Sequence, residues 1–219
     1  MSLNPFPHPP PAMRAALDAL VRQDPRLAPI EIAAGPLPWR VRPPGFPGLL
    51  QAIVAQQISN QAASAIWRRL AALPGALEPA TLQAMDDPAL IGAGLSRPKV
   101  AHARALAAAF VDGRLHTQTL AALDDAQAQS AITAIRGLGP WTAEIYLLFA
   151  LQRPDVFPAG DIAVAGAAAH LLVLPARPAP PALRVLAETW RPYRALAARL
   201  LWHHWRHITG RPAMDDIPA

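Results

Sequence analysis

Residues 134–161, AIRGLGPWTAEIYLLFALQRPDVFPAGD, contain the pattern that decides the fold. Two apolar segments flank a four-residue turn, Gly137-Leu138-Gly139-Pro140, and its proline suits the first position of a helix. The turn therefore predicts a helical hairpin whose backbone N–H groups point outward at the start of a helix over 140–151. Such N–H groups, helped by the helix dipole, bind a phosphate without any lysine. A plain corner between two helices explains the glycines equally well, and the turn alone leaves both interpretations open.

The stretch ends on Asp161, which follows Gly139 by 22 residues. This aspartate stands on a Pro/Gly turn immediately before an apolar helix expected to start at Ile162. Aspartate is a favoured N-cap residue, so a structural cap is one interpretation. A catalytic carboxylate is the other, because Asp161 lies one helix beyond a hairpin suited to phosphate.

Most of the remaining chain repeats apolar residues at helical spacing, and alternating strand-like runs are scarce. One buried helical face is predicted to include Leu49, Leu50, Ile53, Val54, Gln57 and Ile58. Further helices are predicted from capping residues and prolines: Ser59 (through 70), Asp87-Pro88 (to 92–94), Ser96 (98–110), Asp124 with Gln127 (to Gly137), Pro181, and Pro192 (to about His207). Residues 27–41 alone suggest a short extended segment. The fold class is therefore all-α, with about eight to ten helices.

The composition excludes several kinds of chemistry. The chain has 219 residues, 20 basic and 15 acidic ones, no cysteine, and 53% hydrophobic residues. Without cysteine there is no disulfide, thiolate zinc site, cysteine-ligated iron–sulfur cluster or cysteine nucleophile. Lys99 is the only lysine, which makes Schiff-base chemistry improbable. The net charge of +5 suits a polyanionic partner, or reflects a genome that favours arginine and alanine codons.

The two ends of the stretch resemble a known family. Gly137-Leu138-Gly139-Pro140-Trp141-Thr142-Ala143 followed by Asp155-Val156-Phe157-Pro158-Ala159-Gly160-Asp161 is similar to the helix-hairpin-helix-Gly/Pro-Asp DNA glycosylases, closest to the bacterial 3-methyladenine DNA glycosylase II (AlkA-like) branch. Supporting stretches are 52–59, 94–96 with Lys99, and 191–194 leading to Leu201-Trp202. The resemblance implies two interlocked helical domains with a cleft between them. One comprises 1–59 plus 153–219 and carries Asp161, and the other comprises 60–152 and carries the hairpin.

The resemblance also implies a reaction. Asp161 matches the family's catalytic aspartate, which stabilises an oxocarbenium-like sugar and orients or deprotonates the attacking water. Trp141 occupies the position where strand-cleaving relatives carry a catalytic lysine, so we expect hydrolysis of the N-glycosidic bond without lyase activity. No cofactor is required, although the family often holds a monovalent cation at the hairpin. Sodium or potassium is expected here at the carbonyls of Arg136 and Leu138.

Positions that contact DNA in the family match Gln57, Ser59, Lys99, Arg136, Gly137, Gly139 and Thr142. Gln57, at a helix break, is expected to fill the gap that a flipped base leaves, and Lys99 to contact DNA or support the structure. The aromatic pocket for a cationic base is expected to use Trp141, Trp202 and, more weakly, Tyr146. Two further aromatic positions of the family pocket fall at Ile145 and Ile162, and the segment before Phe46 is too short for the N-terminal sheet of larger members.

Other polar groups are given structural interpretations. His203, His204 and His207 include an i, i+4 pair that could bind metal, but we expect a solvated or phosphate-facing helix because no carboxylate accompanies them. The pairs Asp86-Asp87, Asp124-Asp125 and Asp215-Asp216 are interpreted as caps and solvent charge. Trp67 and Trp190 are expected in the core.

The leading hypothesis is a monomeric, monofunctional glycosylase that acts on double-stranded DNA containing alkylated purines. Residues 1–11 lack the features of a signal peptide, and the uncharged stretch 162–174 is too short to span a bilayer, so we expect a bacterial cytoplasmic protein associated with the nucleoid, not with a membrane. A non-catalytic lesion sensor of the same fold is the alternative. An unrelated arginine-rich helical scaffold is a third hypothesis.

Overall fold

The computed structural model describes residues 8–210, and within this range the chain forms thirteen α-helices and two 3-10 helices, with no strand. The predicted all-α class is confirmed. The count exceeds the expected eight to ten because α2, α5, α6 and α8 have six residues each, too few to reveal a helical period in the sequence. None of the helices in the described range is long and apolar enough to cross a bilayer.

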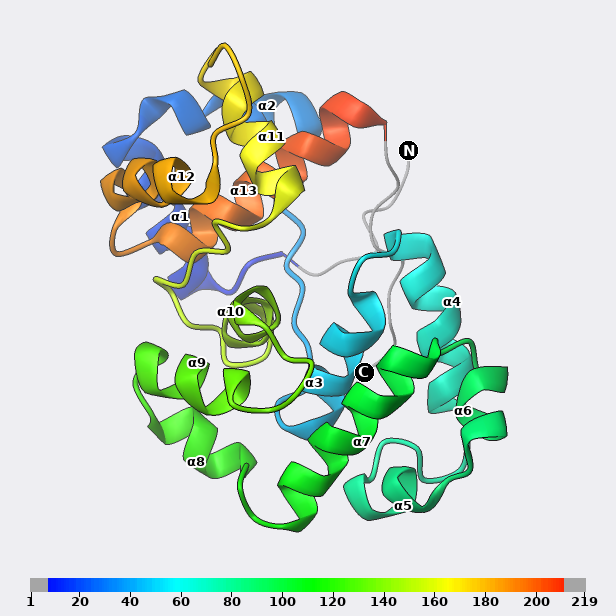
Figure 1. The fold of residues 1–219 in the computed structure, drawn as a ribbon. Coiled ribbons are helices and arrows are strands. Elements are labelled where there is room, and N and C mark those ends of the chain that lie inside the picture. Colours follow the sequence, from blue (N-terminus) through cyan, green and yellow to red (C-terminus); the bar gives the residue numbers. More distant parts are fainter. Residues whose placement is uncertain (1–7, 211–219) are drawn as a thin grey trace. The chain divides into compact units, whose positions relative to one another are not determined.

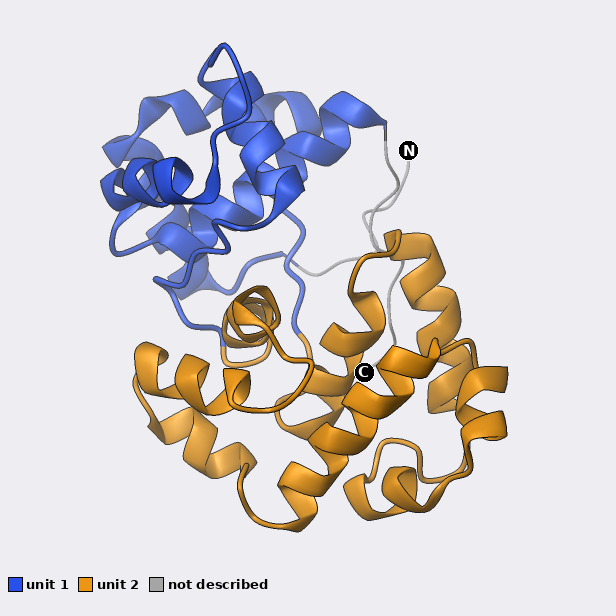
Figure 2. Ribbon diagram, in the orientation of Figure 1, with its two compact units in different colours: residues 1–41, 152–212 blue, residues 42–151, 213–219 orange. Residues whose placement is uncertain are grey.

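The chain divides into two compact units (Figure 2). In the described range, unit 1 comprises 8–41 and 152–210, and unit 2 comprises 42–151. Unit 1 contains α1 (Pro11–Gln23), η1 (Pro25–Leu27), α2 (Pro29–Ala34), α11 (Ile162–Leu171), α12 (Pro180–Ala187), η2 (Glu188–Trp190) and α13 (Arg194–Thr209). Unit 2 contains α3 (Phe46–Ala55), α4 (Asn60–Ala71), α5 (Pro79–Ala84), α6 (Asp87–Gly92), α7 (Arg97–Val111), α8 (Thr117–Ala122), α9 (Asp125–Thr133) and α10 (Pro140–Phe149).

The two junctions lie at 41/42 and 151/152, whereas the predicted boundaries were 59/60 and 152/153. The first difference concerns α3. This helix packs against α7 and α10 and so belongs to unit 2 (Figure 1). Its buried face includes Leu49, Leu50 and Ile53, each without measurable exposure. The hydrophobic face was visible in the sequence, but the helices that cover it were not.

Several predicted helix ends are confirmed. Ser59 caps α4, its Oγ accepting from the N–H of Ala62 at 3.2 Å. Asp124 and Gln127 form the predicted capping box of α9. Pro140 is the first residue of α10, as its position in the turn indicated. These features depend on contacts within four residues, and such contacts are readable in sequence.

Other predicted ends are wrong. α3 ends at Ala55, so Gln57 and Ile58 lie outside it, and Gln57 has a φ of +58°. Asp86 and not Asp87 caps α6, and α9 ends at Thr133, before Gly137. α12 begins at Pro180 and α13 at Arg194, not at Pro181 and Pro192. In the segment 27–41, expected to contain a short extended stretch, the first part forms α2 and irregular backbone follows from Gly35.

Unit 1 is organised around α13, which packs against α1, α2 and α11 (Figure 1). Trp190 is fully buried, as expected, and its Nε1 donates to Asp24 Oδ2 at 2.7 Å. In unit 2, Trp67 is also in the core. The Asp215-Asp216 pair and residues 1–7 lie outside the described residues.

The expectation of a solvated or phosphate-facing helix is wrong for His203 and His204, which are buried on α13. His203 Nε2 lies 2.8 Å from the carbonyl of Gly35, and its Nδ1 lies 3.0 Å from Arg206 Nη2. Because a guanidinium only donates, Nδ1 is the acceptor and Nε2 carries the proton, which gives a neutral imidazole. His204 Nε2 lies 3.0 Å from His170 Nδ1. No group of three potential metal-ligating side chains occurs in residues 8–210.

These histidines predict a loss of stability in mild acid. Burial is the main cause that lowers the pKa of both His203 and His204 in the folded chain. The unfolded chain, with histidine pKa values near about 6.5, then binds more protons as the pH falls, so stability present above that pH is lost below it. We expect the free energy of unfolding, measured in urea, to fall between pH 7.5 and 5. His203→Gln should make that fall shallower, whereas His116→Gln, at an exposed position of unit 2, should leave it unchanged. An equal effect of both substitutions would contradict the assignment.

Candidate functional site

Asp161 is the N-cap of α11, so the capping interpretation is correct. Its Oδ1 accepts from the backbone N–H groups of Ala163 at 2.9 Å and Val164 at 3.0 Å. The same oxygen accepts from Nε1 of Trp202, on α13, at 3.0 Å. The carboxylate is therefore held by its own helix and by the central helix of unit 1. The side chain is half-buried and keeps contact with solvent.

The loop before Asp161 is fixed to the start of α13. Arg194 donates from Nε to Asp155 Oδ1 at 2.9 Å and from Nη2 to Oδ2 at 3.0 Å, a two-pronged pair that is mostly shielded from water. The N–H of Ala195 donates to the carbonyl of Pro154 at 3.0 Å. At the other end, the N–H of Asp161 donates to the carbonyl of Pro158 at 2.9 Å. The sequence motif 155–161 thus forms a loop tied down at both ends, and it gives Asp161 a fixed position in unit 1.

This geometry suits stabilisation of a positive charge. An aspartate with its backbone and side chain already ordered needs little reorganisation when a cation develops beside it, and such preorganised charge lowers barriers by several kcal/mol. Capping and catalysis are therefore compatible, because one carboxylate can do both. From the sequence alone, capping and catalysis were alternative interpretations of Asp161.

In unit 2, the predicted hairpin lies between α9 and α10. The N–H of Leu138 donates to the carbonyl of Ile135 at 3.0 Å, and Leu138 is buried beneath the turn. Arg136, Gly139 and Pro140 are exposed. The exposed edge of the turn therefore carries the residues expected to meet the DNA backbone, and α10 begins directly behind it.

The two glycines of the hairpin have different roles. Gly137 has a φ of +88°, and a Cβ there would lie only 2.1 Å from Cγ of His102, on α7. Gly137 is therefore required by the fold. Gly139 has an ordinary φ of −87°, and a Cβ on it would meet nothing within 4 Å. Only the second glycine leaves its space open for a ligand.

The turn after α3 lies against the same hairpin. Gln56 Nε2 donates to the carbonyl of Gly137 at 3.0 Å and to Oγ1 of Thr142 at 2.9 Å. Next to it, Gln57 is exposed with positive φ. Lys99 Nζ donates to the carbonyl of Val54 at 2.8 Å, and burial lowers the pKa of its amine. The seven predicted DNA-contacting residues therefore all lie in unit 2.

Sequence reasoning missed Gln56. It chose Gln57, whose side chain is free to face outward, over the neighbour that joins the turn to the hairpin. The signal available was the doubled glutamine in 56–57, at a predicted helix break, but the partner of Gln56 is 81 residues away in sequence. Thr142, predicted to contact DNA, is instead 2% exposed, with its hydroxyl turned toward Gln56.

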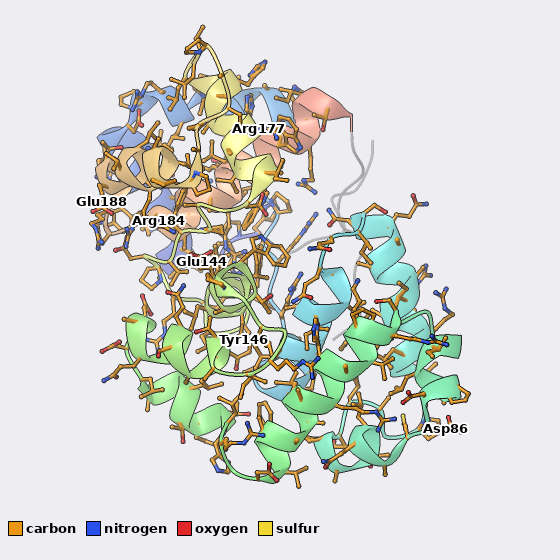
Figure 3. All side chains as sticks on the ribbon, in the orientation of Figure 1. Asp86, Glu144, Tyr146, Arg177, Arg184 and Glu188 are labelled. Atoms are coloured by element: carbon orange, nitrogen blue, oxygen red, sulfur yellow. The ribbon has the colours of Figure 1, made fainter. Side chains whose placement is uncertain are left out.

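The three aromatic pocket candidates have different environments. Trp202 is half-buried beside Asp161, in unit 1. Trp141 is half-buried at the second position of α10, in unit 2. Tyr146, labelled on α10 in Figure 3, is fully buried, and its hydroxyl accepts from the N–H of Gly45 at 2.8 Å. Burial raises the pKa of this phenol. In this structure Tyr146 is a core residue, with no exposed surface to offer a base.

The two aliphatic positions also differ. Ile145 is 3% exposed and belongs to the core of unit 2, whereas Ile162, next to Asp161, is 67% exposed. Ile162 therefore presents an apolar side chain to solvent beside Asp161, as other single apolar residues of the chain do elsewhere.

Comparison with known proteins identifies the family. A model described as the HhH-GPD superfamily base excision DNA repair protein matches residues 50–192, which include the Gln56 turn, the hairpin and Asp161. The chain belongs to the HhH-GPD superfamily. As a member of this superfamily it acts on DNA, and its helical architecture and hairpin are those of the superfamily.

Individual relatives agree with the HhH-GPD assignment. DNA-3-methyladenine glycosylase 1 of Schizosaccharomyces pombe is 30% identical over 158 residues, 70% of this chain and 69% of that protein. A Mycobacterium tuberculosis protein named probable bifunctional transcriptional activator/DNA repair enzyme AlkA is 36% identical over 180 residues, 77% of this chain but only 35% of that protein.

Solved structures resemble this fold. The S. pombe 3-methyladenine DNA glycosylase Mag1, in complex with abasic DNA, superposes with a TM-score of 0.80 at 26% identity, covering 92% of this chain and 99% of that one. A DNA-3-methyladenine glycosidase from Bacillus halodurans gives a TM-score of 0.75 at 31% identity, covering 89% and 91%.

The different roles of the two glycines predict different effects of alanine. Gly139→Ala should weaken binding to duplex DNA about tenfold with little change in stability, and the dependence of log K on log salt should stay unchanged because a neutral N–H group displaces no counterion. Gly137→Ala should instead destabilise the fold by about 1–3 kcal/mol. Affinity titrations over a range of salt concentrations, together with urea unfolding, separate the two. Gly92→Ala, whose Cβ also meets nothing within 4 Å, is the matched control and should affect neither. Unchanged DNA affinity of Gly139→Ala would remove the hairpin from the interface.

Proposed function

We propose that this chain is a DNA glycosylase that flips alkylated purines of the 3-methyladenine type out of double-stranded DNA and hydrolyses the N-glycosidic bond. The product is an abasic site. The observation that carries the proposal is the ordered Asp161 carboxylate, bonded to Trp202 Nε1 and to the first turn of α11, in a superfamily of base excision repair.

The mechanism follows from what a carboxylate does beside a breaking glycosidic bond. As the bond lengthens, positive charge develops on the sugar, and Asp161 stabilises it electrostatically. Water then attacks the sugar carbon, its proton passes to the carboxylate, and the base leaves with the bonding electrons. Alkylation at N3 or N7 makes the purine cationic, hence a good leaving group, which the carboxylate need not protonate.

Substrate selection is proposed to rest on aromatic faces. A cationic base is attracted to the face of tryptophan, an interaction of about 0.5–2 kcal/mol. Trp202 offers such a face next to Asp161, and Trp141 is the second candidate. The printed names of the S. pombe and B. halodurans relatives, both 3-methyladenine enzymes, support this substrate class.

The absence of strand cleavage is also a proposal. Lyase activity of this superfamily's bifunctional members needs a lysine, and Trp141 stands at the corresponding position. Lys99 is the only lysine, and its amine is engaged with the carbonyl of Val54 at the end of α3. Reaction with methylated DNA in the presence of borohydride should therefore trap no covalent complex.

A monovalent cation at the hairpin remains part of the proposal. The carbonyl oxygens of Arg136 and Leu138 are of the donor type that hard cations prefer, while the intervening carbonyl of Gly137 accepts from Gln56. An ion there would add positive charge beside a DNA phosphate. We further propose that the enzyme works as a monomer in a bacterial cytoplasm, on the nucleoid.

Asp161→Asn tests the function directly. Asparagine caps helices as well as aspartate does, so the fold should keep its stability while the negative charge is lost. We expect release of base from methylated duplex to fall at least a thousandfold, with DNA affinity largely unchanged. The readout is free base from duplexes carrying single alkylated purines, measured by chromatography.

The matched control is Asp86→Asn. Asp86 caps α6 in the same way, its Oδ1 accepting from the N–H of Ala89 at 2.8 Å, but it lies in unit 2 (Figure 3). This variant should turn over normally. Full turnover by Asp161→Asn would reject the proposed mechanism, and binding of methylated DNA by the wild type without any base release would favour a non-catalytic lesion sensor.

Trp202→Phe isolates the hydrogen bond to Asp161. A hydrogen bond to a charged group is worth about 1.5–3 kcal/mol, so its loss should slow single-turnover base release by about tenfold or more. Trp205→Phe is the control on the same helix, because Trp205 Nε1 is buried without a hydrogen-bond partner. Its base release should stay near the wild-type rate. Equal rates for both variants would mean that the Trp202 bond does not serve the chemistry.

A further inference from the structure

We infer that Gln56 is a positioning residue that couples the exposed turn at Gln57 to the phosphate-binding hairpin. The inference rests on the proposed function, since it assigns these two elements to one DNA molecule. It concerns unit 2 alone, and it goes beyond that function by naming how the two contacts are held in register.

Gln56 contacts the hairpin directly. The Gln56 side-chain amide donates to two oxygens of the hairpin, the carbonyl of Gly137 at 3.0 Å and Oγ1 of Thr142 at 2.9 Å. One oxygen belongs to the turn and the other to the first turn of α10. A single amide thus spans the point where the hairpin becomes a helix, and it fixes the direction of the N–H groups that face a phosphate.

Gln56 is also bound within its own segment. It is the C-cap of α3, and its N–H donates to the carbonyl of Ile53 at 3.2 Å. The carbonyl of Val54, in the last turn, is held by Lys99. The backbone of Gln56 is therefore anchored to the end of α3, and its side chain is anchored to the hairpin.

The next residue, Gln57, has an unusual backbone conformation. A φ of +58° is uncommon for a residue with a Cβ and persists only where the surroundings impose it. Gln57 and Ile58 are exposed, and Ser59 starts α4 directly after them. The turn is thus held on one side by Gln56 and on the other by the cap of α4, with an outward-facing side chain between.

The hairpin is supported by α7 on the side of Gly137. His102 fills the space beside Gly137, where even a methyl group would overlap. The hairpin cannot retreat toward α7, so its place is set by His102 on one side and by the Gln56 amide on the other. Gln56 consequently transmits the position of the phosphate contact to the residue expected to fill the gap of a flipped base.

A double-substitution experiment tests the coupling. Gln56→Met keeps the length of the side chain but donates no hydrogen bond. Gln57→Asn shortens the outward side chain in a residue type that tolerates positive φ. Affinity for a duplex with one abasic site is measured for the wild type, both single variants and the double variant. We expect each single substitution to cost about five- to tenfold and the double variant to cost no more than the worse single one.

A second readout separates positioning from general support. Gln56→Met should weaken affinity and leave the slope of log K against log salt unchanged, as Gly139→Ala does, because neither the Gln56 amide nor the hairpin N–H groups displace a counterion. Gln23→Met is the matched control, because Gln23 Nε2 also donates to two carbonyls, those of Thr189 at 2.7 Å and Arg191 at 2.9 Å, but in unit 1. It should change neither the affinity nor the slope.

The outcomes are distinct. Multiplied losses in the double variant, or a lowered salt slope in Gln56→Met, which would mean that a cationic contact is lost instead, overturn the coupling while leaving the proposed function intact. A wild type that neither prefers abasic DNA nor releases base overturns both. If Gln56→Met does not fold, Thr142→Val removes one arm of the same contact. Its loss should then also fail to multiply with that of Gln57→Asn, and multiplication would reject the inference.

Discussion

The convergence of three hydrogen-bond donors on one oxygen of Asp161 is the constraint on which unit 1 depends. Two donors are backbone N–H groups of the first turn of α11, and the third is Nε1 of Trp202 on α13. The carboxylate thus ends a loop, starts a helix and joins that helix to its neighbour. A residue bound in this way has a fixed charge at a fixed place, which is what stabilisation of a developing cation requires.

Unit 2 presents a different physical problem, the binding of a polyanion with little net positive charge. Its residues 42–151 contain eight basic and seven acidic side chains, so net charge does little for it. In the proposed complex with DNA, backbone N–H groups at the hairpin substitute for side-chain charge. Rigidity comes from Gln56 on one side and His102 on the other, and it explains why the two hairpin glycines are not equivalent. The described part of unit 1, with eleven arginines and six acidic residues, holds the positive excess.

Local features of the site were predictable because they depend on neighbours in sequence. The cap at Asp161, the cap at Ser59 and the start of α10 at Pro140 each need only three or four residues. Burial was less predictable. Tyr146 and Thr142 lie on α10, where most positions face the core, and a helix that is apolar all round gives no sign of which polar groups point inward. His203 and His204 were misjudged because α11 and the segment at Gly35 cover them only in the folded chain.

The sequence by itself determined the chemistry that this protein can perform. A missing cysteine, a single lysine, and an aspartate at a set spacing after a glycine hairpin are properties of composition and order, and folding does not change them. The tertiary structure alone decided which residues lie beside the hairpin and beside Asp161. Gln56 meets Gly137 across 81 residues, Trp202 meets Asp161 across 41, and α3 joins unit 2. The physical reason is that hydrogen bonds and burial between distant segments depend on how whole helices pack, whereas caps and turns depend on the few residues that form them.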